Sequence, residues 1–298
     1  RILFSLLDGR TRMYHFGAGS CGRICRSSSN DSDSDIGVTI SQDKGESHSL
    51  LVNLGFSVPD QIRFNADIPA ESIKQIAREI GFPCVVKPSD TDRGQGVTAN
   101  ICNYEELKDA IDFAKKSTRR PTLSLQKHVE GADFRLNITG GRLKFVVKRS
   151  APVIIGNGID TVKVCIEKLN LVRRSMKAHD NLSIEIDPYD KEVVKCLTSA
   201  GFSADSVIDS GLIVPLRKNS NVSTGGLRED IKLEDVHPRI VNQCLSIAKT
   251  FRLDSCGIDY ITTDIRLDPL CHPGAFIEVN SMPQQQPARA AHLVQNLF

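Results

Sequence analysis

A carboxylate and an amide lie two positions apart near the end of the sequence, in the stretch FIEVNSMP (276–283). Alternate residues of a strand project from one face of a sheet, so Glu278 and Asn280 are predicted to lie side by side. Oxygen ligands of these types suit a magnesium ion that is also bound to phosphates. Asp259 lies in a strand-like stretch that would pair with this one as a hairpin, where it completes the set. A solvated sheet face explains Glu278 and Asn280 about equally well.

A lysine followed by a glycine-containing loop forms a second candidate, in PCVVKPSDTDRGQGVT (83–98). The ammonium of Lys87 at a strand end, followed by flexible backbone N–H groups, suits phosphate oxygens. The spacing matches neither the Walker A loop nor G-x-G-x-x-G, which excludes those two mechanisms. A turn between two strands explains Gly94 and Gly96 at least as well, so the stretch by itself leaves both interpretations open.

Two further stretches suit a ligand, but each also has an ordinary explanation. In QKHVEGADFR (126–135), extended backbone can bond an adenine edge and the carboxylate of Asp133 can accept from ribose hydroxyls. The entry to a hairpin is the more common explanation of such a string. The backbone of NVSTGG (221–226) could approach an anion closely, because glycine has no Cβ to obstruct it. A surface loop would look the same.

The helices and strands that would position these residues follow from the local pattern. Apolar residues at helical spacing predict a helix over 69–80, which Gly81 ends. Asn103 and Glu106 form a capping-box pair at the start of another helix. The predicted helices are 69–80, 103–117, 161–170 and 238–251, and the predicted strands are 84–88, 123–129, 134–138, 142–148, 257–265 and 275–280. Their irregular alternation favours an α+β fold with sheets that carry helices on one face.

Composition excludes several classes of protein. A net charge of +2 and the absence of Trp give no reason to expect a nucleic-acid partner. No apolar run approaches the roughly 20 residues that a membrane-spanning helix needs, so no membrane partner is expected. Nine cysteines without C-x-x-C pairs predict buried free thiols and a cytoplasmic location. The chain starts without Met or a signal-peptide layout, which predicts a fragment or a trimmed chain.

The order of the motifs is more specific than any one of them. Lys-Pro with a glycine loop, then Gln-Lys-x-Val-x-Gly-x-Asp, then Gly-Ile-Asp and Glu-Val-Asn resembles the ATP-grasp superfamily. From about residue 12 onward, the chain looks closest to the ATP-grasp portion of cyanophycin synthetases and related amino-acid ligases. The resemblance is carried by residues 15–23, 40–59, 82–98, 129–162, 216–231, 256–265 and 276–283.

The resemblance implies a role for each matching residue. Nucleotide phosphates would be contacted by Lys44 and Lys87, under a mobile loop, Ser89–Gly96, that includes Gly94 and Gly96. Adenine would bind along Gln126, Lys127 and Val129, with Asp133 on the ribose and magnesium held by Asp259, Glu278 and Asn280. The acceptor and the transferring phosphoryl group would meet Arg135, Arg149, Ser223, Thr224, Gly225 and Gly226. Lys44, Lys87 and Arg149 are the residues assigned to catalysis.

The implied fold is an ATP-grasp fold, in which two α+β subdomains hold ATP between them. The expected division is an N-terminal segment 1–43, a first subdomain 44–129 and a second subdomain 130–298. The implied activity is an ATP- and Mg²⁺-dependent ligase that joins a small carboxylate to an amine, an amino acid or peptide, through an acyl phosphate. Ligases of this kind often form dimers, so a homo-oligomer is also expected.

Two alternatives stay open beside the ligase. In the first, the chain is a nucleotide-binding module of a larger enzyme, without activity of its own. In the second, it is an interaction domain in which the motif carboxylates are incidental. One departure concerns the acceptor: the sequence reads SMPQQQPARAAHL after Glu-Val-Asn, where the relatives usually have a Pro-Gly turn. This departure concerns the acceptor substrate more than ATP binding.

Overall fold

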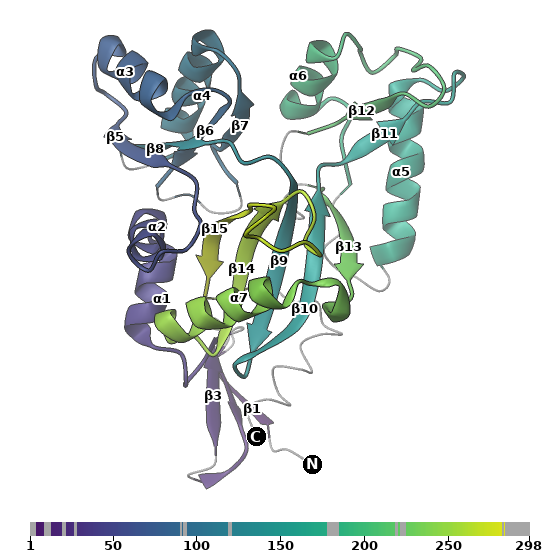
Figure 1. Cartoon of the computed structure of the whole chain (residues 1–298). Coiled ribbons are helices and arrows are strands. Elements are labelled where there is room, and N and C mark those ends of the chain that lie inside the picture. Colours follow the sequence, from purple (N-terminus) through teal and green to yellow (C-terminus); the bar gives the residue numbers. More distant parts are fainter. Residues whose placement is uncertain are drawn as a thin grey trace.

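A computed structural model describes residues 4–8, 13–19, 22–26, 29–89, 91, 94–118, 121–177, 185–217, 220, 225–281 and 283 (Figure 1). Its centre is an antiparallel five-stranded sheet in the order β13-β10-β9-β14-β15. These strands are β9 (Ala132–Thr139), β10 (Arg142–Ser150), β13 (Leu227–Ile231), β14 (Ser255–Thr262) and β15 (Ala275–Asn280). One face of the sheet is covered by α1 (Asp35–Gln42), α2 (Lys44–Asn53) and α7 (Pro238–Phe251).

Alternation along the central strands decides which face is the core. Phe134, Leu136 and Ile138 of β9 pack against α7 residues such as Ile240 and Ile247. The residues that alternate with them, including Asp133 and Arg135, therefore project from the opposite face. That opposite face carries the polar side chains that the sequence singled out.

A second antiparallel sheet has the order β5-β8-β6-β7 and its own core. Cys84, Val86, Leu123 and Leu125 face the two helices, whereas Lys87 lies on the other face. Its elements are β5 (Gln61–Asn65), α3 (Ala70–Ile80), β6 (Cys84–Pro88), β7 (Thr98–Ile101), α4 (Tyr104–Ser117) and β8 (Thr122–Lys127). Figure 1 shows this sheet and its helices above the central sheet.

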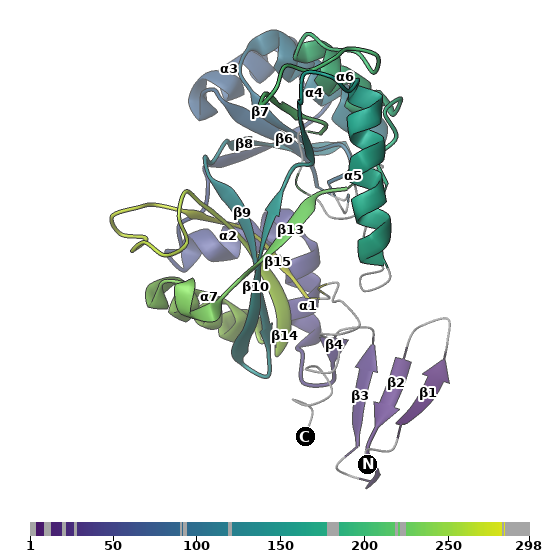
Figure 2. The ribbon, with the colours of Figure 1, turned by 90° about the vertical axis from the view of Figure 1, so that its right-hand side faces the viewer.

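Two smaller units complete the described chain. The first has a separate core and contains β11 (Val153–Ile155), α5 (Val162–Lys177), α6 (Lys191–Ser199) and β12 (Ile213–Pro215). The second is an antiparallel sheet of β1 (Phe4–Asp8), β2 (Met13–Phe16), β3 (Arg23–Arg26) and β4 (Ser29–Asn30). Figure 2 shows β1–β3 side by side and set apart from the helices. A 3₁₀ turn, η3 (Leu233–Asp235), precedes α7.

The structure confirms most of the predicted elements, and α7 begins and ends where it was predicted. The helix predicted over 161–170 extends to Lys177. Its second half escaped detection because the buried positions there are polar, Asn170 and Arg173. The strand predicted over 257–265 ends at Thr262, where Asp264 begins a turn by accepting a hydrogen bond from the Arg266 N–H.

The predicted subdomain boundaries (1–43, 44–129 and 130–298) stay a prediction. The cores group the described residues differently, because Val38, Ile40, Leu50, Leu51, Phe56 and Val58 all pack with the central sheet. By core membership, the first helices thus join the part that begins at residue 130. Within the described ranges, no helix is both long enough and apolar enough to cross a membrane.

Candidate active site

A row of charged residues crosses the polar face of the central sheet. Strand register places Asp259 of β14 between Arg135 of β9 and Glu278 of β15. Asp133 of β9 is the partner of Arg149 on β10. The hairpin predicted to bring Asp259 beside Glu278 is therefore confirmed. Five residues that are as far as 145 positions apart become neighbours (278 − 133 = 145).

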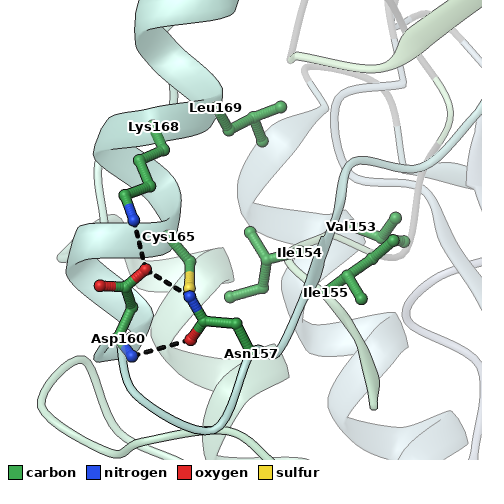
Figure 3. A pocket seen from close by; sticks show the side chains of 8 residues that line it. All are labelled: Val153, Ile154, Ile155, Asn157, Asp160, Cys165, Lys168 and Leu169. Atoms are coloured by element: carbon green, nitrogen blue, oxygen red, sulfur yellow. Dashed lines mark hydrogen bonds and ion pairs between the residues drawn. The ribbon is translucent and has the colours of Figure 1, made fainter. Parts of the chain in front are cut away.

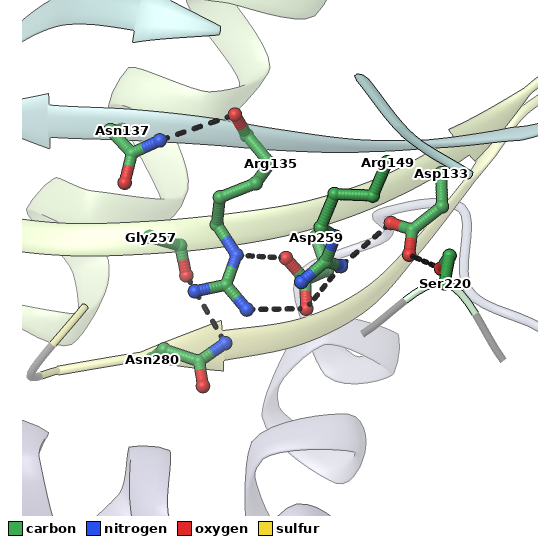
Figure 4. Close-up of polar contacts among 8 residues, drawn as sticks. All are labelled: Asp133, Arg135, Asn137, Arg149, Ser220, Gly257, Asp259 and Asn280. Atoms are coloured by element: carbon green, nitrogen blue, oxygen red, sulfur yellow. Dashed lines mark hydrogen bonds and ion pairs between the residues drawn. The ribbon is translucent and has the colours of Figure 1, made fainter. Parts of the chain in front are cut away.

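The charges in this row are joined by hydrogen bonds (Figure 4). Arg135 binds Asp259 through two nitrogens, with Nε donating to Oδ1 and Nη2 donating to Oδ2 at 2.9 Å. Arg149 Nη2 lies 2.7 Å from Asp133 Oδ1 and 3.0 Å from Asp259 Oδ2. Ser220 completes the network by donating to Asp133 Oδ2 at 2.6 Å. Four of the predicted site residues thus belong to one continuous network.

Electrostatics follow from this geometry. Burial works against the charged form of Arg149, but Asp259 and Asp133 together raise its pKa above the ordinary value. Burial likewise acts to raise the pKa of Asp259, yet Arg135 and Arg149 hold it below the usual range. Both shifts favour the charged forms of Arg149 and Asp259.

Lys87 lies on β6 and faces this row. Burial lowers its pKa to about 8, although the nearby carboxylates of Glu278, Asp259 and Asp133 act in the opposite direction. Lys44 adds a like charge that lowers the pKa further. The structure therefore brings Lys87 close to Lys44, the other predicted phosphate lysine, and to the predicted metal carboxylates. Lys87 Nζ donates a hydrogen bond to Gln126 Oε1.

The predicted adenine stretch divides between the two faces of β8. Gln126 is buried on the same face as Lys87, and its amide Nε2 donates to Gln61 Oε1 at 3.4 Å. The Lys127 side chain projects from the other face, where Nζ donates to the Phe82 carbonyl at 3.0 Å. Among the described residues, none accepts a hydrogen bond from the Val129 N–H. The Val129 N–H, rather than the Lys127 side chain, is hence available to a ligand.

Lys44 and the loop 89–96 are in direct contact. Lys44 is the first residue of α2, and its Nζ donates to the Thr91 carbonyl. The Ser89 hydroxyl donates to the Thr122 carbonyl at 2.9 Å, so it is directed at β8. A Cβ at Gly96 would lie 2.7 Å from Ser117 Cβ, so the loop needs a glycine there for close approach. Asp90, Asp92 and Arg93 lie outside the described residues.

The loop predicted to contact the acceptor is described only at its end. Ser223 and Thr224 lie outside the described residues, whereas Gly225 and Gly226 are buried. The Gly225 carbonyl accepts a hydrogen bond from Arg173 of α5, a residue that is 5% exposed. Burial lowers the pKa of Arg173.

The oxygens at the end of the row suit a magnesium ion. Asp259 and Glu278 are register partners, and Asn280 pairs with Gly257, two residues before Asp259. Asn280 Nδ2 donates to the Gly257 carbonyl at 3.4 Å, which leaves its Oδ1 for a cation. Two carboxylates and an amide oxygen are the donors that magnesium prefers beside phosphates. Among the described residues, no group of three His, Cys, Asp or Glu forms a metal site.

Four residues of the site escaped the sequence analysis. Gln61 becomes visible only through its pairing with Gln126 on β8. Ser220 and Arg173 carry no pattern that separates them from surface residues. Gly257 is the first residue of the Gly-Ile-Asp motif, but only the structure shows that the Arg135 side chain lies against it.

A separate pocket lies on the small unit built from β11 and α5 (Figure 3). Its volume is about 190 Å³. Polar contacts at its rim join Asp160 to Lys168 and to Asn157, the latter at 2.6 Å. None of the predicted site residues lines it, since the lining is Val153, Ile154, Ile155, Asn157, Asp160, Cys165, Lys168 and Leu169.

Comparison with known proteins shows the class to which the chain belongs. A bifunctional glutathione synthetase from Pasteurella multocida superposes with a TM-score of 0.67 at 21% identity, over 100% of this chain and 42% of that one. A D-alanine–D-alanine ligase from Bacillus anthracis superposes with a TM-score of 0.54 at 16% identity, over 89% and 68% of the two chains. The chain has this fold and belongs to the ATP-grasp superfamily. No family model matches it.

Within this superfamily the chain is similar to named ligases. It is 32% identical over 250 residues to the cyanophycin synthetase of Crocosphaera subtropica, a match that covers 83% of this chain. It is 28% identical over 185 residues to the bifunctional glutathione biosynthesis protein of Streptococcus agalactiae, over 60% of this chain. The chain spans 28% of the length of the former protein and 24% of the latter.

Proposed function

We propose that the protein is an ATP- and magnesium-dependent carboxylate–amine ligase that forms an amide or peptide bond through an acyl phosphate. One observation carries the proposal: Lys87 of one sheet faces the Asp133, Asp259 and Glu278 carboxylates of the other. A cation opposite a set of metal-binding carboxylates is the arrangement that a triphosphate with its magnesium requires. The names of the related proteins, which are ligases, support the same activity.

The chemistry assigns a task to each group. A carboxylate is a poor electrophile until a phosphoryl group is transferred to it, after which an amine displaces phosphate. Lys44 and Lys87 would neutralise the phosphate oxygens, while Arg135 and Arg149 would stabilise charge on the transferring group. Asp259, Glu278 and Asn280 would hold a magnesium ion, which would supply positive charge to the phosphates. This mechanism requires no nucleophile from the protein.

An acyl phosphate must be kept from water until the amine attacks. The loop 89–96 is suited to that task, because its Thr91 carbonyl accepts a hydrogen bond from Lys44 of α2. We therefore assign the loop as the cover of the nucleotide phosphates. The proposed substrates are a small carboxylate and an amine, an amino acid or a peptide. The free state of all the described cysteines supports a cytoplasmic location.

Amino-acid-dependent release of phosphate from ATP tests the proposal. A screen of amino acids and dipeptides with the full chain should identify a pair that stimulates phosphate release. Lys87→Ala and Glu278→Gln are expected to reduce that release by at least about a hundredfold, with the fold retained. Arg266→Gln, on an exposed turn, is the matched control and should retain full activity. Unchanged turnover in both site variants would refute the assignment of the site.

A second candidate function is a nucleotide-binding module without turnover of its own. The chain spans only 28% of the length of a cyanophycin synthetase, which favours this possibility. Tight binding of MgATP without phosphate release on any acceptor would support it. Phosphate release that depends on an amino acid would exclude it.

A further inference from the structure

Gly257 lies on β14, two residues before Asp259, at the point where the Arg135 side chain crosses the sheet. A Cβ at position 257 would lie 2.8 Å from Arg135 Cδ and 3.0 Å from Arg135 Nη1. Its φ is not among the positive values of the chain, so any residue could adopt this backbone. Glycine is thus needed here for space, and the Arg135 side chain occupies that space.

From this position Arg135 binds both oxygens of Asp259. Arg149 occupies a further site on Oδ2, at 3.0 Å. A carboxylate offers about four lone-pair sites, so arginine nitrogens use most of those on Asp259. The Asp259 side chain is only 6% exposed, which leaves little room for another cation to approach from solvent.

Asp259 is also the carboxylate assigned to magnesium, together with Glu278 and Asn280. We propose that Arg135 competes with magnesium for Asp259, and that Gly257 sets the strength of this competition by leaving space for Arg135. The inference rests on the proposed function, because it takes Asp259 as a metal ligand.

Physical reasons favour an exchange over simultaneous contact. A guanidinium and a divalent cation on the same two oxygens repel each other, and each needs the same lone pairs. An arginine released from Asp259 would remain beside the phosphates, where its N–H groups could bind the transferring phosphoryl oxygens. The coupling is reciprocal: whatever draws Arg135 toward phosphate oxygens also strengthens magnesium binding at Asp259.

A simple long-range field offers a different explanation, since any nearby positive charge weakens the binding of a cation. Charge-conserving variants distinguish direct competition for Asp259 from this long-range electrostatic effect. Arg135→Lys keeps the charge but cannot make the two-pronged contact. Gly257→Ala keeps every charge and displaces the guanidinium by steric overlap. Arg135→Gln removes both the contact and the charge.

The experiment measures Mg²⁺ affinity by titration calorimetry on the full chain, with Mg²⁺ alone and with Mg²⁺ in the presence of ADP. Arg135→Gln is expected to tighten Mg²⁺ binding about tenfold, and Gly257→Ala and Arg135→Lys about fivefold. The control Arg266→Gln removes an exposed positive charge that is paired with Asp264, and should stay within about twofold of the wild type. Thermal unfolding with and without Mg²⁺ gives a second readout, in which the gain in Tm follows the affinities.

Each outcome decides the question. If Arg135→Gln binds Mg²⁺ more tightly while Gly257→Ala and Arg135→Lys keep the wild-type affinity, the effect is a long-range electrostatic one. That result would overturn the proposed competition. If Gly257→Ala fails to fold, Arg135→Lys alone decides. A wild-type chain that binds no Mg²⁺ in the presence of ADP overturns the proposed function, and this inference with it.

Discussion

At the scale of single residues, Lys87 shows most directly a conflict between burial and the positive charge that a phosphate contact needs. Its side chain is half-buried, and burial lowers its pKa to about 8 from an ordinary value of 10.5. The surrounding carboxylates recover only part of the lost hydration. Lys87 therefore costs stability in the protein alone, and this cost decreases when phosphate oxygens neutralise it.

Nucleotide affinity is expected to depend on pH through Lys87. A phosphate contact needs the protonated amine, which is lost as the pH rises through about 8. Affinity for MgADP should fall by about tenfold between pH 7 and pH 9, in proportion to the loss of protonated Lys87. Titration calorimetry across this range provides the measurement, and Lys87→Met should abolish the dependence. A flat wild-type profile would contradict the role of Lys87.

Stability is expected to increase when Lys87 is replaced by Met. The pKa of Lys87 is lower in the folded than in the unfolded state, so the unfolded chain binds more protons between about pH 8 and 10.5. Wild-type stability thus rises with pH in that window, and the full cost is present below it. Lys87→Met should raise the free energy of unfolding at pH 7 by about 2 kcal/mol, after allowance for the lost bond to Gln126. Urea unfolding at pH 7 and pH 10 should show the difference shrinking at the higher pH.

At the scale of elements, a single side chain fixes the start of the helix that carries Lys44. Asp43 ends α1 and begins α2, and its Oδ1 accepts from the N–H groups of Gly45 at 2.9 Å and Glu46 at 3.1 Å. Because Lys44 is the first residue after this cap, the cap determines where the lysine lies. Asn103 begins α4 in the same way, with Oδ1 accepting from the Glu106 N–H at 2.9 Å.

These two caps form a matched pair for mutation. Asp43→Ala and Asn103→Ala should each lower the free energy of unfolding by about 1 kcal/mol. Only Asp43→Ala should also weaken MgADP binding, by up to about fivefold, because it releases the first turn around Lys44. Chemical denaturation and calorimetry measure the two effects. Equal losses of affinity in both variants would show that general destabilisation is responsible.

At the scale of the whole molecule, the site belongs to no single core. Lys87 and Gln126 lie on the sheet that packs with α3 and α4, whereas Asp133, Arg149 and Asp259 lie on the central sheet. Lys44 comes from α2, which packs with the central sheet. A ligand bound among these residues must therefore connect two separately packed units.

Hydrogen exchange should report this connection. With MgADP bound, the backbone amides of β6, β8, β14 and β15 should exchange at least about tenfold more slowly. The β11–β12 ribbon has its own core and serves as the internal control, with unchanged exchange. Protection confined to one of the two sheets would contradict a site shared between them.

Much of this arrangement follows from the sequence, because its signals are local. The spacing of Ile73, Ile76 and Ile80 predicted α3, and the alternation in FIEVN placed Glu278 and Asn280 on one face. The opposite directions of the Lys127 and Gln126 side chains also follow from alternation, and the resemblance assigned both residues to the adenine-binding stretch. Buried polar positions such as Asn170 and Arg173 gave no local signal, because their partners lie elsewhere in the chain.

The sequence by itself determined the family, the order of the motifs and the chemical types of the site residues. These depend on residue identity and on spacing within short stretches. Only the tertiary structure decided that Arg135 binds Asp259 and that Arg149 joins Asp259 to Asp133. It also decided that Gly257 leaves the space for the Arg135 side chain. The contact between Arg135 and Asp259 is set by strand register between segments 124 residues apart, which no local pattern encodes. The residues carry the chemistry, and the sheet register decides which of them meet.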